Sequence, residues 1–258
     1  MPDIARSREA EAFLDARQHT DPRVVTACQG WTAHEITAHL TGIAAEITRH
    51  LDPYLQGDAV PATRSFEERE APYQAMDDEA LCRRLVDEEQ TARAVIGKVL
   101  DQEPEAVIPW TGRTMAVAKF LPHLRNEFAI HRWDFVGDDD LGTELLSQPE
   151  LTEHAVGILG RILLVRGYKN DPSPGEDFHV RLRTERGPDV RLTVEAGQAG
   201  LELVDDRTDG RDDEPHVDLD PAARTLVIWG RRPDRRDRFR STLSQPDLQR
   251  MQTLLAGY

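Results

Sequence analysis

The chain has 258 residues, which is enough for one large domain or two of medium size. Its formal net charge of -15 and its pI near 5.0 argue against nucleic acid or an anionic membrane as the main partner. Two cysteines, Cys28 and Cys82, are too few for a disulfide framework or a thiolate metal site, and they suit a reducing cytoplasm. The N-terminus lacks the apolar segment of a signal peptide, and no apolar run approaches the ~18 residues of a membrane helix. We therefore expect a monomeric cytoplasmic protein that acts on small molecules.

The first half of the chain carries the apolar spacing of four helices. They are expected near residues 3–18, from residue 32 onward, over about 77–100 and over about 115–135. The second helix has the clearest start, because Thr32 as N-cap and Glu35 three residues later form a capping box. Segments 53–77 and 103–113 are rich in proline, glycine or charge and are predicted to be connections. This arrangement predicts a four-helix bundle.

The start of the second expected helix contains a pattern close to a zinc-protease motif. His34 and His39 enclose the sequence E-I-T-A, which is one residue longer than the H-E-x-x-H motif requires. A spacing of five residues turns the two side chains about 140° apart on a helix, so they cannot share a metal. We therefore reject a protease of this type.

Glu127 and His131 in the fourth expected helix are candidates for a metal site. They are four residues apart, so their side chains lie on one face, and apolar residues flank that face. A carboxylate that faces a core is costly unless it is paired. A divalent metal would pair it, with His39 on the second helix as the best third ligand. The alternative is that an arginine pairs Glu127 and that His131 is an ordinary core histidine, since E-x-x-x-H is short and common.

The second half of the chain changes to the alternation of β-strands. The acidic run at 137–140 is predicted to be a solvated linker, and a helix over about 149–166 follows it. Apolar residues then alternate with polar ones in three short strands, around 178–182, 190–194 and 201–203. The remaining expected elements are a strand at 216–220, a helix at 221–229, a strand at 238–242 and a helix at 246–256. We predict an α-helical domain over 1–148 and an α+β domain over 149–258.

The chain also carries short motifs in a fixed order. They are Cys28-x-Gly30-Trp31-Thr32, Ala38-His39-Leu40, Glu127-x-x-x-His131-Arg132-Trp133-Asp134 and Leu226-x-x-Trp229-Gly230-Arg231. In this order and spacing they resemble the actinobacterial mycothiol-dependent maleylpyruvate isomerase family, over essentially the whole chain. The resemblance implies a DinB-like four-helix bundle followed by a sterol-carrier-like α+β domain.

The same resemblance implies a set of metal ligands. His39, Glu127 and His131 would bind a zinc ion and leave one position open, as in catalytic zinc sites. His123, one turn before Glu127 on the same face, is the rival ligand. Asp134, three residues after His131, could accept a hydrogen bond from the free ring N–H of a ligand histidine and fix its tautomer. The alternative for Asp134 is an ordinary aspartate near a helix C-terminus.

In the resembled enzymes the open zinc position takes the thiol of mycothiol, and coordination favours the thiolate. Addition of the thiolate to a cis double bond such as that of maleylpyruvate, rotation and elimination would give the trans isomer. The anionic substrate calls for a cation. Arg231 is the first candidate, because a guanidinium binds a carboxylate bidentately. Arg232, Arg235 and Arg236 compete with it, and a solvated basic turn is the alternative.

Membership of such a family does not fix the reaction, because related folds carry different chemistry. A mycothiol S-transferase, or a zinc hydrolase or lyase, would use the same three ligands. A non-enzymatic binder of lipid or another small molecule is an alternative from a different class, and a thiol-responsive stress protein is a third. The expected partners are a small-molecule substrate and a low-molecular-weight thiol.

Overall fold

The computed structural model describes residues 4–205 and 214–256, and the chain divides into two compact units between Phe135 and Val136. The first unit is helical and the second is α+β, as the sequence predicts. The predicted boundary after residue 148 lies later, between two short helices of the second unit, and it stays a prediction. No helix among the described residues is both long enough and apolar enough to cross a membrane.

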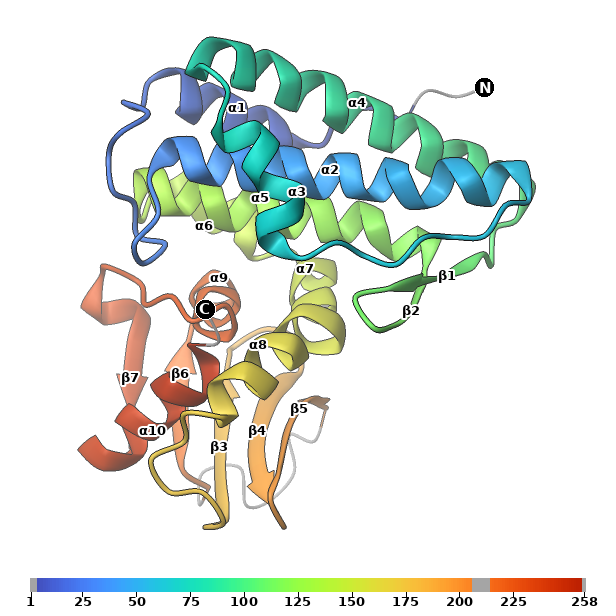
Figure 1. The fold of residues 1–258 in the computed structure, drawn as a ribbon. Coiled ribbons are helices and arrows are strands. Elements are labelled where there is room, and N and C mark those ends of the chain that lie inside the picture. Colours follow the sequence, from blue (N-terminus) through green and yellow to red (C-terminus); the bar gives the residue numbers. More distant parts are fainter. Residues whose placement is uncertain (1–3, 206–213, 257–258) are drawn as a thin grey trace. The chain divides into compact units, whose positions relative to one another are not determined.

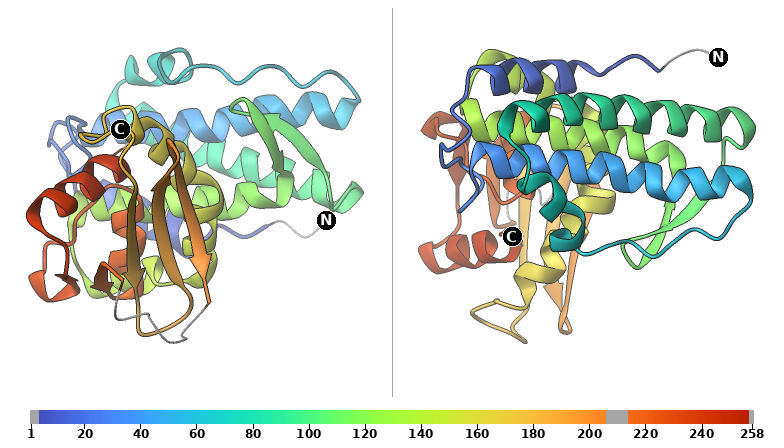
Figure 2. Two further views of the ribbon diagram at one scale, coloured as in Figure 1. Left: turned by 90° about the horizontal axis from the view of Figure 1, so that it is seen from below. Right: turned by 45° about the horizontal axis from the view of Figure 1, so that its top comes forward.

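The first unit is a bundle of long helices with one short helix across it. Its helices are α1 (Arg8–Gln18), α2 (Ala33–Gln56), α3 (Phe66–Gln74), α4 (Asp78–Gln102) and α5 (Phe120–Val136). Figures 1 and 2 show α1, α2, α4 and α5 side by side, with α3 lying across α2. The apolar stripe of α2 is fully buried, and the rings of Phe13 on α1 and Phe128 on α5 meet at 5.4 Å. Residue 3, where the first helix was expected to begin, lies outside the described residues.

The predicted start of α2 is confirmed. Thr32 accepts a hydrogen bond from the backbone N–H of Glu35, and the carboxylate of Glu35 accepts one from the backbone N–H of Thr32. This capping box fixes where the helix begins and therefore which face carries His39. The helix ends at Gly57, whose φ of 75° is a left-handed conformation that glycine adopts readily.

Two predicted connections contain regular structure. Segment 53–77 includes α3, whose start is fixed by a second capping box between Ser65 and Glu68. Segment 103–113 leads into a hairpin of β1 (Val107–Trp110) and β2 (Arg113–Ala116), so α5 begins at Phe120 and later than predicted. The hairpin turn is Thr111-Gly112, and both residues have positive φ, as a type I′ turn requires.

The second unit is a five-stranded sheet with helices. Its strands are β3 (Phe178–Arg183), β4 (Asp189–Glu195), β5 (Gln198–Val204), β6 (His216–Leu219) and β7 (Phe239–Ser241). Its helices are α6 (Asp140–Leu146), α7 (Pro149–His154), α8 (Gly160–Tyr168), α9 (Pro221–Ile228) and α10 (Gln245–Leu255). The strand order is β5-β4-β3-β6-β7, with β3 parallel to β6 and every other pair antiparallel. The three strands predicted from alternating residues are confirmed as β3, β4 and β5.

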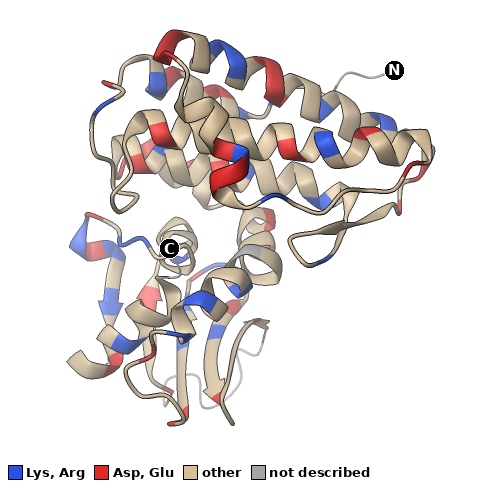
Figure 3. Ribbon diagram, in the orientation of Figure 1, with Lys and Arg blue, Asp and Glu red and all other residues tan. Residues whose placement is uncertain are grey.

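Two further expectations for the second unit are wrong in detail. The acidic run at 137–140 is not a solvated linker, because Asp138 forms an ion pair with Arg238 and Asp139 caps α6. The helix expected over 149–166 is divided into α7 and α8 by one π-helical turn at Ala155–Leu159. Acidic and basic residues alternate along the ribbon of both units (Figure 3), unlike the clustered basic residues of a nucleic-acid-binding protein.

Candidate metal centre

The bundle brings together the three residues that the sequence suggested as metal ligands. His39 comes from α2, while Glu127 and His131 lie one turn apart on α5. The Nε2 atoms of His39 and His131 each lie 3.5 Å from Oε2 of Glu127. One ligand atom from each of the three residues falls within 4.8 Å of the other two, and all three side chains are buried. This is the spacing expected of atoms that surround one metal ion.

A carboxylate orients each imidazole. Oδ2 of Asp134 lies 2.8 Å from Nδ1 of His131, and Oε1 of Glu70 lies 2.7 Å from Nδ1 of His39. An ionised carboxylate can only accept, so each Nδ1 carries the proton and each Nε2 presents its lone pair. Nitrogen lone pairs from two rings therefore point toward Glu127. Carboxylates that orient ligand histidines in this way are usual in metal sites.

Three polar atoms at the centre lack partners. Nε2 of His39, Oε2 of Glu127 and Nε2 of His131 are buried and make no hydrogen bond with any described residue. Each such buried atom costs about 1–3 kcal/mol. The 3.5 Å contacts between them are longer than the 2.7–2.9 Å typical of charge-assisted hydrogen bonds. A divalent metal would satisfy all three atoms together, so these residues fit a metal ion such as the zinc that the family resemblance implies.

The charges of the cluster also favour a cation. Burial alone would raise the pKa of Glu127, but the adjacent imidazoles of His131 and His39 outweigh it, and the pKa lies well below its usual value. Burial would lower the pKa of His131, but Asp134 and Glu127 reverse this, so its pKa is raised. Both shifts mean that the carboxylates attract positive charge to this point, which a proton or a metal can supply.

His123, the rival ligand, lies beside the cluster. Its Nε2 is 3.8 Å from Oε1 of Glu127, whereas the other two histidines contact Oε2. Burial lowers its pKa to about 4, so the ring is neutral at pH 7. Among the described residues, the three-ligand groups do not include His123. The geometry therefore favours His123 as a neighbour of Glu127.

Cys28 belongs to a second possible group of ligands. Its thiol, His131 and Asp134 also place ligand atoms within 4.8 Å of one another, although the sequence gave no reason to expect a thiolate site. A metal there would compete for Nδ1 of His131, which already has Asp134 as its partner at 2.8 Å. The group of His39, Glu127 and His131 needs no such rearrangement and is the better site.

Sequence reasoning missed two residues on α3. Glu70 orients His39, and Arg69 places a cation beside it, with Nη2 3.4 Å from Oε1 of Glu70. Arg69 is 5% exposed, its guanidinium lies 4.3 Å above the ring of Phe66, and its Nε has no hydrogen-bond partner within the described ranges. Burial lowers its pKa, while the charges of Glu70 and Glu127 oppose that effect. The signal that could have found them is the S-x-x-E capping box at Ser65.

Two other residues complete the description. Trp31, just before α2, sets its ring 5.0 Å from that of His39 and stacks at 6.4 Å on that of His131. Arg231, the predicted substrate-binding cation, belongs to the second unit, is buried, and donates from Nη1 to the backbone oxygen of Trp229. Its role toward a substrate stays a prediction.

The comparisons with known proteins agree on one family. The family model described as the mycothiol maleylpyruvate isomerase N-terminal domain matches residues 5–135, a range that contains the whole cluster. A crystal structure of a mutant of the mycothiol-dependent maleylpyruvate isomerase has a TM-score of 0.61 at 13% identity, covering 91% of this chain and 88% of that one. A second crystal structure of the mycothiol-dependent maleylpyruvate isomerase has a TM-score of 0.60 at 13% identity, with 88% and 86% covered. At this identity the likeness shows the fold. No curated protein matches the sequence.

Proposed function

This chain belongs to the family of the mycothiol maleylpyruvate isomerase N-terminal domain, and from that premise we propose that it is a zinc-dependent enzyme of the maleylpyruvate isomerase type, which uses mycothiol to act on a small electrophilic acid. The observation that carries the proposal is the group of three buried, unpartnered atoms on His39, Glu127 and His131. Two imidazoles and one carboxylate are a ligand set of catalytic zinc sites, which keep a further position open.

The residues around the cluster have distinct proposed roles. Zinc, when bound, would supply a Lewis acid that stabilises the thiolate of mycothiol at neutral pH. Asp134 and Glu70 hold the Nδ1 protons, so that the Nε2 atoms stay available. Trp31 covers one side of the two imidazoles with apolar surface and limits access of water. Arg69 supplies a buried positive charge for an acidic substrate, and Arg231 remains a second candidate for that role.

The leading reaction is a cis–trans isomerisation. The sulfur of the thiolate forms a bond to one carbon of the substrate's conjugated double bond, and the electron pair of that double bond moves onto the neighbouring carbonyl to give an enolate. The former double bond is then single and can rotate. Collapse of the enolate expels the thiolate and restores the double bond in the trans form, so the thiolate is regenerated and nothing is oxidised or reduced. If the adduct were released instead, the same residues would make the protein a mycothiol S-transferase.

Metal analysis and a thiol-dependent assay test the proposal. We expect about one zinc per chain, and little in His39→Ala or Glu127→Ala. His34→Ala is the matched control, because His34 lies on the same helix but contacts Asp78 and the backbone of Gln74. Turnover of maleylpyruvate should require mycothiol and be lost in the metal-free variants.

The outcomes separate the alternatives. Full activity without metal would overturn the zinc-dependent mechanism. Conjugation of an electrophile without isomerisation would identify an S-transferase. A protein that binds neither metal nor thiol and copurifies with lipid would instead be the non-enzymatic carrier.

A further inference from the structure

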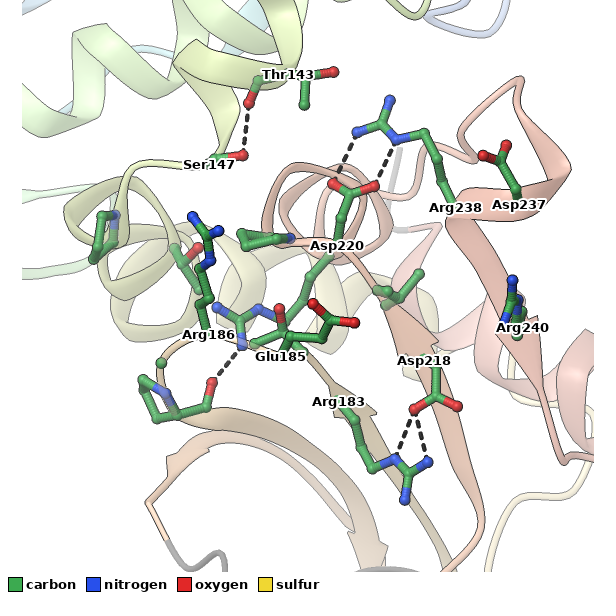
Figure 4. A pocket seen from close by; sticks show the side chains of 18 of the residues that line it. Thr143, Ser147, Arg183, Glu185, Arg186, Asp218, Asp220, Asp237, Arg238 and Arg240 are labelled. Atoms are coloured by element: carbon green, nitrogen blue, oxygen red, sulfur yellow. Dashed lines mark hydrogen bonds and ion pairs between the residues drawn. The ribbon is translucent and has the colours of Figure 1, made fainter.

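The second unit contains a cavity of about 930 Å³ that no part of the proposed reaction uses. It is bordered by the turn between β3 and β4, the start of α9 and the segment that leads into β7 (Figure 4). All of its lining residues lie between positions 140 and 240, so the cavity belongs to this unit alone. Its volume is within the range of sites for small organic ligands.

Half of the arginines of the lining form ion pairs with carboxylates of the same lining. Ion pairs join Arg183 to Asp218 at 2.7 Å and Arg238 to Asp220 at 2.6 Å, and Figure 4 shows both. A third pair joins Arg235 to Asp237 at 2.9 Å. The charges of these six side chains cancel in pairs, so none of them needs a ligand to neutralise it. A cation that binds a ligand must therefore be one of the other arginines of the lining.

Among the described residues, Arg224 is a buried arginine of the lining that has no carboxylate partner. It lies on α9 and is 3% exposed, and Nη1 donates to the backbone oxygen of Pro188 in the turn between β3 and β4. Its Nε is buried without a hydrogen-bond partner, and no carboxylate of a described residue lies within ion-pair distance of the guanidinium. Of the described residues, Asp189 acts on it by charge from a distance, and Asp189 is engaged with Arg181. Burial lowers the pKa of Arg224 to about 10, so it remains a cation at neutral pH.

The unpaired edge of Arg224 has the shape that recognises an oxyanion. Because Nη1 is occupied by Pro188, the edge that remains consists of Nε and Nη2. Two parallel N–H groups on one edge of a guanidinium match the two oxygens of a carboxylate or phosphate. An unpaired buried charge is costly, and a bound anion would relieve that cost. The exposed Arg186, on the same turn as Pro188, adds a second positive charge to the lining.

We propose that this cavity binds a small organic molecule through an oxyanion, a carboxylate or a phosphate, which is held by the Nε–Nη2 edge of Arg224 with Arg186 at the rim. The carboxylate of Glu185, also on the turn, is exposed and forms no ion pair with Arg224, so it leaves this edge to a bound anion. The proposal concerns the second unit and does not depend on the metal centre.

The test measures saturable binding of two probes to the full-length protein by calorimetry and thermal unfolding. Maleate represents the carboxylates and inorganic phosphate the phosphates, with sodium chloride at equal ionic strength as the reference. At least one probe should bind saturably and raise the unfolding temperature. Arg224→Gln keeps a donor near Pro188 but removes the charge, and should weaken binding roughly ten- to hundredfold. Arg186→Gln, at an exposed position, should weaken it severalfold.

Two controls make the result decisive. Arg161→Gln removes an exposed arginine of the same unit outside the lining, and should bind like the unmodified protein. Glu127→Ala disables the metal centre and should leave probe binding intact. The proposal is overturned if neither probe binds saturably, if Arg224→Gln and Arg186→Gln both bind as well as Arg161→Gln, or if binding is lost only in Glu127→Ala.

Discussion

Glu70 should control how tightly the bundle holds its metal. Its carboxylate lies 2.7 Å from Nδ1 of His39, and the two residues are 4% and 2% exposed, so water cannot take its place. Glu70→Gln keeps an oxygen acceptor of the same length but removes the charge. The difference between a charge-assisted and a neutral hydrogen bond is about 1–1.5 kcal/mol. This corresponds to roughly a tenfold weaker zinc affinity, the lower end of what outer partners of metal ligands contribute.

Competition with a chromogenic zinc chelator measures the effect. Glu67→Gln is the matched control, because Glu67 is on the same helix but exposed. Glu70→Ala should lose roughly a hundredfold, since it leaves the Nδ1 proton of His39 buried without an acceptor. If Glu70→Gln held zinc as tightly as Glu67→Gln, the assignment of Glu70 as the partner that orients His39 would be refuted.

Three further predictions concern other residues. His123→Ala should keep about one zinc per chain by metal analysis, and loss of the metal would restore His123 as a ligand. Arg69→Met should raise the KM of an acidic substrate roughly tenfold or more, because a charged hydrogen bond is lost. Its zinc content should not change. If the KM stayed the same, Arg231 would become the leading candidate for binding the acidic substrate. Asp171→Asn should lower the free energy of unfolding by about 1–3 kcal/mol at pH 7, because Asp171 accepts two hydrogen bonds from Arg250. Burial would raise the pKa of Asp171, but Arg250 outweighs it and holds the pKa below its usual value. The contribution is therefore complete above about pH 4 and lost as the pH falls through the lowered pKa, so denaturation curves of variant and parent should converge in acid.

Local signals in the sequence were enough to place the metal ligands on their helices. The capping box at Thr32 determines where α2 begins and therefore which of its faces carries His39. A spacing of four residues places Glu127 and His131 on one face of α5. The same kind of signal is present at Ser65, but α3 is short and weakly amphipathic and contains a proline, so its sequence does not indicate a helix. Elements are predictable where a motif of three or four residues decides them.

Contacts between distant residues could not be read in the same way. The ion pair between Asp138 and Arg238 joins residues 100 positions apart. In the sequence the acidic run that contains Asp138 resembles a solvated linker, but this pair ties it into the fold. Glu70 can be recognised as the partner of His39 only once α3 is known to pack across α2. Arg224 is one of many arginines in the sequence, and its burial and its unpaired Nε distinguish it only in the structure.

The charge balance of the bundle explains why a divalent ion suits this cluster. At their formal charges Glu70, Glu127 and Asp134 bring three negative charges into a buried region, and Arg69 returns one positive charge. Two negative charges remain, and one divalent metal would match them. A metal would bind Nε2 of His131, the atom that would also carry the second proton of the ring, so metal and proton exclude each other there. Because the pKa of His131 is raised, metal binding at a pH below that pKa should release this proton to the solvent.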